Sequence, residues 1–171
     1  MILRLSRKLC TKIKTGKLSE MPLDDNPFAD WSAHLFVADR TQYILLSNTK
    51  SLYSTVMYGK GVTNDSHFIQ CALSSIRKAL EDDRHESIYL RFIAPASGTV
   101  SFAKALNRSV TGSMNDLIRF ATAWLVEEGL SPQDVGFKLN GILLSAIAPS
   151  KSDVYGKPRE AFKAMVSGEG A

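Results

Sequence analysis

Residues 107–116 bring hydroxyl, amide and guanidinium groups together with a glycine, directly before the best-patterned helix of the chain. A helix N-terminus attracts anions, because its first N–H groups are unsatisfied and its dipole adds positive charge. Arg108 is suited to hold a phosphate or carboxylate through paired hydrogen bonds, and nearby hydroxyl groups add donors. The candidate ligand-binding residues are Asn107, Arg108, Ser109, Thr111, Gly112, Ser113 and Asn115.

A purely architectural role explains part of the same pattern. Ser113 is a natural N-cap for the helix that follows, and Asp116 stands three positions later, as in a capping box. Gly112 is suited to a backbone conformation with positive φ. The stretch has neither the P-loop ending nor the dinucleotide fingerprint, so helix capping and an anion site both remain open.

The histidines lack the spacing of metal ligands and fall in three separate contexts. His34 lies in the middle of an expected strand, where we predict a hydrogen-bonded structural residue. His67 opens an expected helix and His85 lies in a charged turn, so both are predicted at the surface.

The acidic clusters and the thiols carry equally ordinary predictions. The carboxylates of Asp24, Asp25 and Asp30, and those of residues 81–83, are expected to be solvated rather than to bind a metal. Cys10 and Cys71 form no CxxC motif and are expected to be buried or incidental thiols in a reducing cytoplasm. The sequence therefore predicts no catalytic residue, no metal and no cofactor.

The N-terminal segment is strongly basic, with Glu20 as its first acidic residue. Although this resembles a transit peptide, residues 1–5 have the pattern of a strand, and Ser6 can cap a short helix that buries Leu9 and Ile13. The cations then form either a solvated face or a surface that contacts nucleic-acid phosphates. They are Arg4, Arg7, Lys8, Lys12, Lys14 and Lys17.

Length and composition are those of an ordinary globular domain. The chain has 171 residues, 44% hydrophobic and 22% charged, with a net charge of +4. We expect one domain over residues 1–166 and a disordered tail over 167–171. No apolar run reaches the roughly 18 residues of a membrane span, so no membrane partner is expected, and a cytoplasmic location is predicted.

The hydrophobic pattern predicts an α+β fold. Expected strands cover residues 1–5, 31–38, 42–48, 52–58, 87–94 and 100–106. The strand at 31–38 alternates as if half-buried, and short connections favour an antiparallel arrangement. Asn64 or Ser66 begins an amphipathic helix at 68–80, and a second covers 114–125. Further helices are expected after Ser131-Pro132 and at 158–166. We predict a mainly antiparallel sheet with both principal helices packed on one side of it.

Several segments resemble an uncharacterised bacterial family that is known only as a domain of unknown function. They read MILRLSRKL at residues 1–9, DWSAHL at 30–35, DRTQYILLSN at 39–48 with SL at 51–52, and NRSVTGSMND at 107–116. The resemblance implies a compact cytosolic domain with no established activity. It also implies that the fold begins near residue 1.

Three functional interpretations follow. The leading one is a non-catalytic binding or regulatory module whose ligand is an anion, with a protein partner left open. The second is an enzyme acting on a phosphate-bearing substrate, in which Arg108 and Ser113 hold the phosphate. His34, Asp30 or Asp116 is then the acid or base. The third is a nucleic-acid binder that uses the basic N-terminal face.

Overall fold

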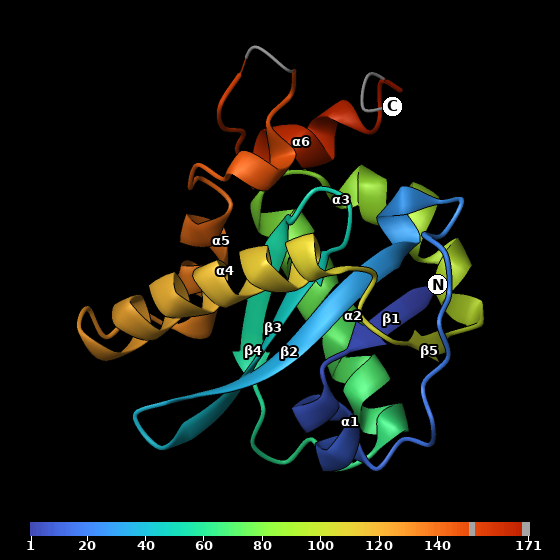
Figure 1. The fold of residues 1–171 in the computed structure, drawn as a ribbon, viewed down its shortest axis with the longest axis vertical. Coiled ribbons are helices and arrows are strands. Elements are labelled where there is room, and N and C mark those ends of the chain that lie inside the picture. The colour runs from blue at the N-terminus through green and yellow to red at the C-terminus, as the bar shows by residue number, and fades with distance from the viewer. Residues whose placement is uncertain (151–152, 169–171) are drawn as a thin grey trace.

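A five-stranded sheet forms the centre of the fold in the computed structural model, which describes residues 1–150 and 153–168. The strand order is β4-β3-β2-β1-β5 (Figure 1). The strands are β1 (Ile2–Leu5), β2 (Asp30–Ala38), β3 (Thr41–Asn48), β4 (Ser54–Tyr58) and β5 (Ser101–Ala103).

The sheet is mixed, with an antiparallel meander as its larger part. β2, β3 and β4 pair antiparallel in sequence order, as their short connections predict. The β2–β3 turn consists of Asp39 and Arg40, both with positive φ, which suits the twist of a two-residue hairpin. β1 runs parallel to both β2 and β5. The sheet is thus mainly antiparallel, as expected, and its parallel part arises because a helix and a long connection carry the chain from β1 back to the start of β2.

In the part of the chain that the structure describes, six helices surround the sheet. The capping residues expected from the sequence correctly predict where three of them begin. Ser6, Asn64 and Ser131 each accept a backbone N–H at the start of a helix. The helices are α1 (Arg7–Ile13), α2 (Asp65–Asp82), α3 (Glu86–Ile88), α4 (Arg108–Val126), α5 (Pro132–Leu139) and α6 (Pro158–Ala164). No helix among the described residues has the length and apolar character needed to cross a membrane.

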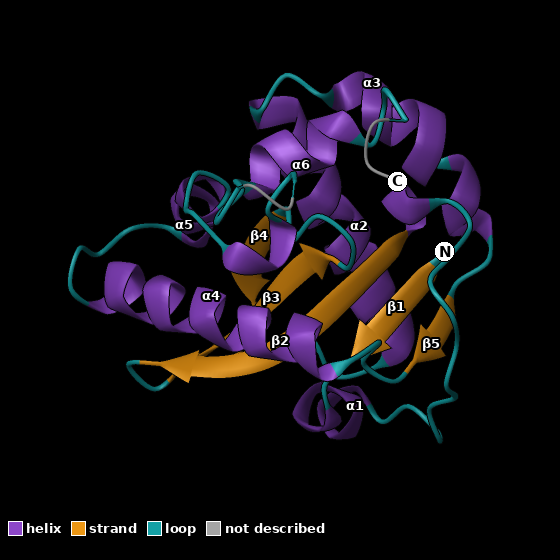
Figure 2. Ribbon diagram, turned by 45° about the horizontal axis from the view of Figure 1, so that its top comes forward, coloured by secondary structure: helices purple, strands orange, loops and turns teal. Residues whose placement is uncertain are grey.

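The two long helices cover opposite faces of the sheet, which corrects the expectation of a single packed side. Trp31 and Ala33 of β2 share one hydrophobic core with α2, whereas Phe36 and Ala38 share another with α4. Because side chains alternate across a strand, these pairs point to opposite faces. Figures 1 and 2 both show α4 crossing in front of β2 and β3, and α2 lying behind them.

Residues 87–94, expected to form a strand, are helical. α3 ends at Ile88, and the π-helical turn Tyr89–Ile93 follows it directly. Ile88, Tyr89 and Ile93 are buried, whereas Leu90 is exposed, which matches a helix rather than a strand. The apolar alternation that suggests a strand here fits equally well into a buried helical segment.

The C-terminal region packs back onto the domain. The Phe162 side chain of α6 is fully buried beside Trp31 and Tyr53, and Met165 lies at the edge of the same core. Of the tail expected to be disordered, residues 169–171 lie outside the described part of the chain. The segment 142–147 contains only a short helical turn and one bridge between Leu144 and Gly156.

Candidate functional site

The stretch 107–116 is not a loop but the beginning of α4. The helix starts at Arg108, and Asn107 is its N-cap, whose Oδ1 accepts the N–H of Val110 at 2.9 Å. Ser113 therefore lies inside the helix and caps nothing, and Gly112 has no positive φ. The sequence contains two capping signals six residues apart, and the earlier one starts the helix.

A cavity of about 220 Å³ opens at this end of α4. Antiparallel pairing creates it, because Trp31 of β2 lies opposite Asn48 of β3, and Thr49 donates its N–H to the Asp30 carbonyl. The β3–β4 turn is thereby held beside the first turns of α4. The lining residues are Leu23, Thr49, Lys50, Leu52, Leu106, Asn107, Ser109, Val110, Ser113, Ala146 and Ile147.

The polar groups of this cavity include hydrogen-bond donors without partners. Ser113 is 9% exposed, and its hydroxyl makes no hydrogen bond to any described residue. The hydroxyls of Thr49 and Ser32 lie 2.9 Å apart and both are buried. One donates to the other, so one hydroxyl hydrogen of the pair remains available. Lys50 is exposed and forms no ion pair within the described chain.

Only part of the predicted ligand set lines the cavity. Asn107, Ser109 and Ser113 do, whereas the remaining candidates point elsewhere on the helix. Thr111 donates its hydroxyl to the Asn107 carbonyl. Arg108 is exposed and free of ion pairs among the described residues, but it does not line the cavity. The others outside the lining are Gly112 and Asn115.

Lys50 and Thr49 are the site residues that sequence reasoning missed. They lie more than fifty positions before α4, within a turn that carries no motif. The signal that was available is weak: a lysine at the end of a strand that leads to a Ser- and Thr-rich turn. Only the pairing of β2 with β3 brings this turn to the start of α4.

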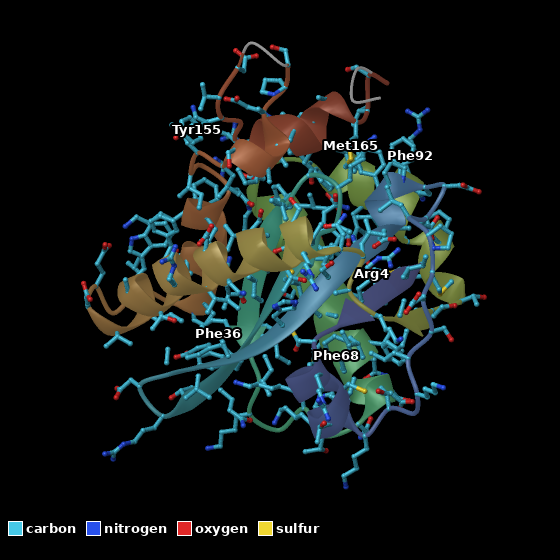
Figure 3. The ribbon with its side chains drawn as sticks, in the orientation of Figure 1. Arg4, Phe36, Phe68, Phe92, Tyr155 and Met165 are labelled. Carbon is cyan, nitrogen blue, oxygen red and sulfur yellow. The ribbon has the colours of Figure 1, made fainter. Side chains whose placement is uncertain are left out.

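A buried ion pair fixes the strands that frame the cavity. Arg4 is 1% exposed and Asp30 is 0% exposed, and the guanidinium binds the carboxylate through two hydrogen bonds of 2.8 Å. Arg4 also donates to the carbonyls of Met21, Pro22 and Lys104, at 2.9, 2.7 and 3.3 Å. Figure 3 shows Arg4 in the middle of the molecule, beside β2. Lys104 precedes Asn107 by three residues, so Arg4 helps to hold the chain that enters α4.

The acid and base candidates do not meet at the cavity. Asp30 is held by Arg4, and Asp116 pairs with Arg119 at 2.5 Å. His34 is buried on the α4 face of the sheet, but the cavity lining does not include it. Its side chain makes no hydrogen bond within the described residues, contrary to the prediction, and burial lowers its pKa.

His85 also departs from its predicted surface setting. Its Nε2 atom is buried without a hydrogen-bond partner among the described residues. Burial is the main cause that lowers the pKa of His85, and the nearby charge of Lys163 adds to it. His67 is exposed near the start of α2, as expected.

The other clusters carry no metal-like geometry. Within residues 1–150 and 153–168, no group of three His, Cys, Asp or Glu side chains is placed to hold a metal ion. Both cysteines are free and half-buried, and the Cys10 sulfur lies 2.8 Å from the Thr15 hydroxyl. Asp30, which is fully buried, corrects the expectation that the carboxylates of its cluster are solvated.

The basic N-terminal segment loses one cation to the interior. Arg4 is buried, and Lys12 donates to the Gln42 side chain at 2.6 Å. The remaining cations are exposed on and after α1, with no ion pair in the described chain. They are Arg7, Lys8, Lys14 and Lys17.

A larger cleft of about 630 Å³ lies between α2, β4 and α5, but its lysine and its aspartate, Lys78 and Asp82, already pair with each other. Thr55 and Ser75 share a hydrogen bond of 2.9 Å. Asp82 binds both Lys78 and Gln133, which links α2 to α5. The smaller cavity at α4 is therefore the stronger candidate for a charged ligand.

Comparison with known proteins gives a family but no activity. No curated protein and no solved structure matches the chain. A family model described as a domain of unknown function, DUF6933, matches residues 2–161. The match extends beyond the last resembling segment at residues 107–116, and it includes all residues that line the α4 cavity and the first part of α6. The chain belongs to the DUF6933 family of domains of unknown function.

Proposed function

We propose that this protein is a non-catalytic binding module that holds the phosphate group of a small ligand in the cavity at the start of α4. The observation that carries the proposal is that the unpartnered Ser113 hydroxyl and the unpaired Lys50 face the same cavity as the first turn of a 19-residue helix. A hydroxyl that has no partner in the protein is free to donate to an anion, which supplies the missing acceptor.

The cavity offers several hydrogen-bond donors to an anion. Asn107 occupies the N–H of Val110, whereas the N–H of Ser109, a lining residue, is free at the helix end. The hydroxyls of Ser109 and Ser113 and the Lys50 ammonium add to this donor. A phosphate monoester offers three terminal oxygens to such a set, whereas a carboxylate offers two.

The enzymatic alternative lacks a positioned acid or base. Asp30 and Asp116 are occupied by arginines, and His34 does not reach the cavity lining. Lys50 is a cation and is therefore suited to binding an anionic group. The geometry therefore supports binding better than proton transfer. The two free thiols favour a reducing compartment such as the cytoplasm.

Calorimetric titration with inorganic phosphate tests the proposal. We expect wild type to bind and Lys50→Ala to bind about tenfold or more weakly, because hydrogen bonds to charged groups contribute about 1.5–3 kcal/mol. Ser113→Ala should weaken binding less, since a neutral hydroxyl contributes less than a charge.

Lys60→Ala is the matched control. Lys60 is an exposed lysine just after β4 that does not line the cavity, so its removal changes net charge by the same amount. Its phosphate affinity should equal that of wild type. Equal losses in Lys50→Ala and Lys60→Ala, or no phosphate binding by wild type, would overturn the proposal.

A second candidate function is nucleic-acid binding through the basic N-terminal face. The observation that favours it is the exposure of four unpaired cations on and after α1: Arg7, Lys8, Lys14 and Lys17. Such binding weakens steeply as salt rises, whereas a phosphate held inside a cavity is screened less. A short oligonucleotide in the same titration, at low and high salt, separates the two functions.

A further inference from the structure

A second cavity adjoins the proposed phosphate site. It measures about 490 Å³ and lies between the segment 146–149 and α6. Lys50, Ala146 and Ile147 line both cavities, so the two share a wall and one cation. A group bound to Lys50 in the smaller cavity therefore has the larger cavity immediately beside it.

The second cavity has a mainly apolar lining. Seven of its lining side chains are apolar: Ala146, Ile147, Ala148, Pro149, Ala161, Ala164 and Met165. Its polar side chains are already occupied. Ser51 donates its hydroxyl to Asn48, and Lys157 pairs with Glu160 at 3.6 Å. Apart from Lys50, this cavity offers surface that favours a ligand group without charge.

The volumes of the two cavities also suit a ligand that has an anionic group and a larger uncharged group. Small-molecule sites usually occupy about 300–1,000 Å³, so a cavity of 220 Å³ holds an anionic group but little else. The neighbouring 490 Å³ falls within that range. Such sites are mostly apolar with a few placed polar groups, which is the combination that the two cavities make together.

We infer that the ligand of this protein is an amphiphilic phosphate monoester, whose phosphate binds at the start of α4 and whose apolar group lies in the cavity against α6. The inference rests on the proposed function, because Lys50 serves both parts. Lys50 lines both cavities, and a lysine side chain is suited to this place because its ammonium binds an anion while its methylene chain packs on apolar surface.

The test compares phenyl phosphate with glycerol phosphate, which have similar size but an apolar and a polar body. Calorimetry on wild type should show phenyl phosphate binding about tenfold or more tightly, because a buried ring is stabilised by apolar burial. Inorganic phosphate serves as the reference for the anion site alone. Equal affinities for the two esters, with inorganic phosphate still bound, would overturn the inference and leave the proposed function intact.

Variants of α6 locate the apolar group. Ala164→Phe fills the second cavity and should abolish the preference for phenyl phosphate while inorganic phosphate binds as before. Ala161→Leu, a smaller change at the same wall, repeats the test if Ala164→Phe fails to fold. Ala123→Phe, at a half-buried alanine of α4 that lines neither cavity, should keep the preference.

The remaining outcomes are also decisive. If wild type binds none of the three phosphates, the proposed function itself fails. If Ala161→Leu and Ala164→Phe leave the preference for phenyl phosphate unchanged, the ring lies elsewhere and the inference is overturned, although the phosphate site stands.

Discussion

At the scale of single residues, Arg4 is the clearest case in which the structure reverses a surface interpretation. In the sequence it is one of six cations near the N-terminus; in the fold it is buried against Asp30 and three backbone carbonyls. The Asp30 carboxylate balances the positive charge of Arg4, and each of these contacts joins Arg4 to a segment that is distant in sequence. Arg4 therefore stabilises the fold and is not part of a surface that could contact nucleic acid.

Replacing Arg4 alone should be severe. Arg4→Met leaves the Asp30 carboxylate buried without a counterion, which typically costs about 3–5 kcal/mol of unfolding free energy. Urea unfolding measures the loss. The double variant Arg4→Met with Asp30→Leu should recover much of the stability, because no charge is then stranded.

Arg7→Met is the control for that prediction. Arg7 is exposed and carries the same charge, so its removal should change stability by no more than about 0.5 kcal/mol. Similar unfolding midpoints for Arg4→Met and Arg7→Met would contradict the role given to the buried pair.

At the scale of elements, the first turn of α4 combines a structural and a proposed binding role. Asn107 caps the helix and also lines the cavity. The two roles impose different requirements, since a cap needs only a side-chain oxygen, whereas an anion site excludes negative charge. A substitution can therefore keep one and remove the other.

Asn107→Asp should separate the roles. Aspartate caps as well as asparagine and interacts favourably with the helix dipole, so urea unfolding should show stability equal to or above wild type. Phosphate affinity, measured by calorimetry, should fall because a carboxylate then faces the cavity. Asn107→Ala should instead lose about 1 kcal/mol of stability through the missing cap.

The discriminating result is the affinity of Asn107→Asp. Phosphate binding as tight as that of wild type would mean that the cavity is not the anion site and that Asn107 only caps the helix.

At the scale of the whole molecule, the two faces of the sheet differ in chemistry. The α2 face of β2 presents Trp31 and Ala33 to an apolar core, while the α4 face runs from Asp30 through Ser32 and His34 to Phe36. The polar end of this row lies at the start of α4, where the candidate cavity opens. Covering both faces with helices buries His34 and makes stability depend on pH.

Stability should fall as the solution becomes mildly acidic. Burial lowers the pKa of His34 below the ordinary value of 6.5, so below that pH the unfolded chain takes up a proton that the folded chain resists. The stabilisation is complete above about pH 6.5 and declines towards the lower folded pKa. Urea unfolding at pH 7.5 and pH 5.5 measures the difference.

His34→Gln removes this titration and should reduce the difference in unfolding free energy between pH 7.5 and pH 5.5. His67→Gln is the matched control, since it is the same substitution at an exposed histidine near the start of α2. An equal change in unfolding free energy between the two pH values in wild type and His34→Gln would contradict this prediction.

The sequence by itself determined features that depend on neighbouring residues. Ser6 and Ser131 cap their helices through contacts to a backbone N–H three residues away, and the hairpin turn at Asp39 and Arg40 joins adjacent strands. Such contacts join residues only a few positions apart, so residue type and spacing predict them. The stripe of α2 follows from helical period for the same reason.

Only the tertiary structure decided which distant groups meet. Arg4 and Asp30 are 26 positions apart, and Arg4 and Lys104 are 100 positions apart. Lys50 reaches the start of α4 because β2 pairs with β3, and α2 and α4 separate because alternate side chains of β2 face opposite ways. These contacts depend on strand order and packing across the whole chain, which no local pattern specifies; the candidate site consists mostly of them.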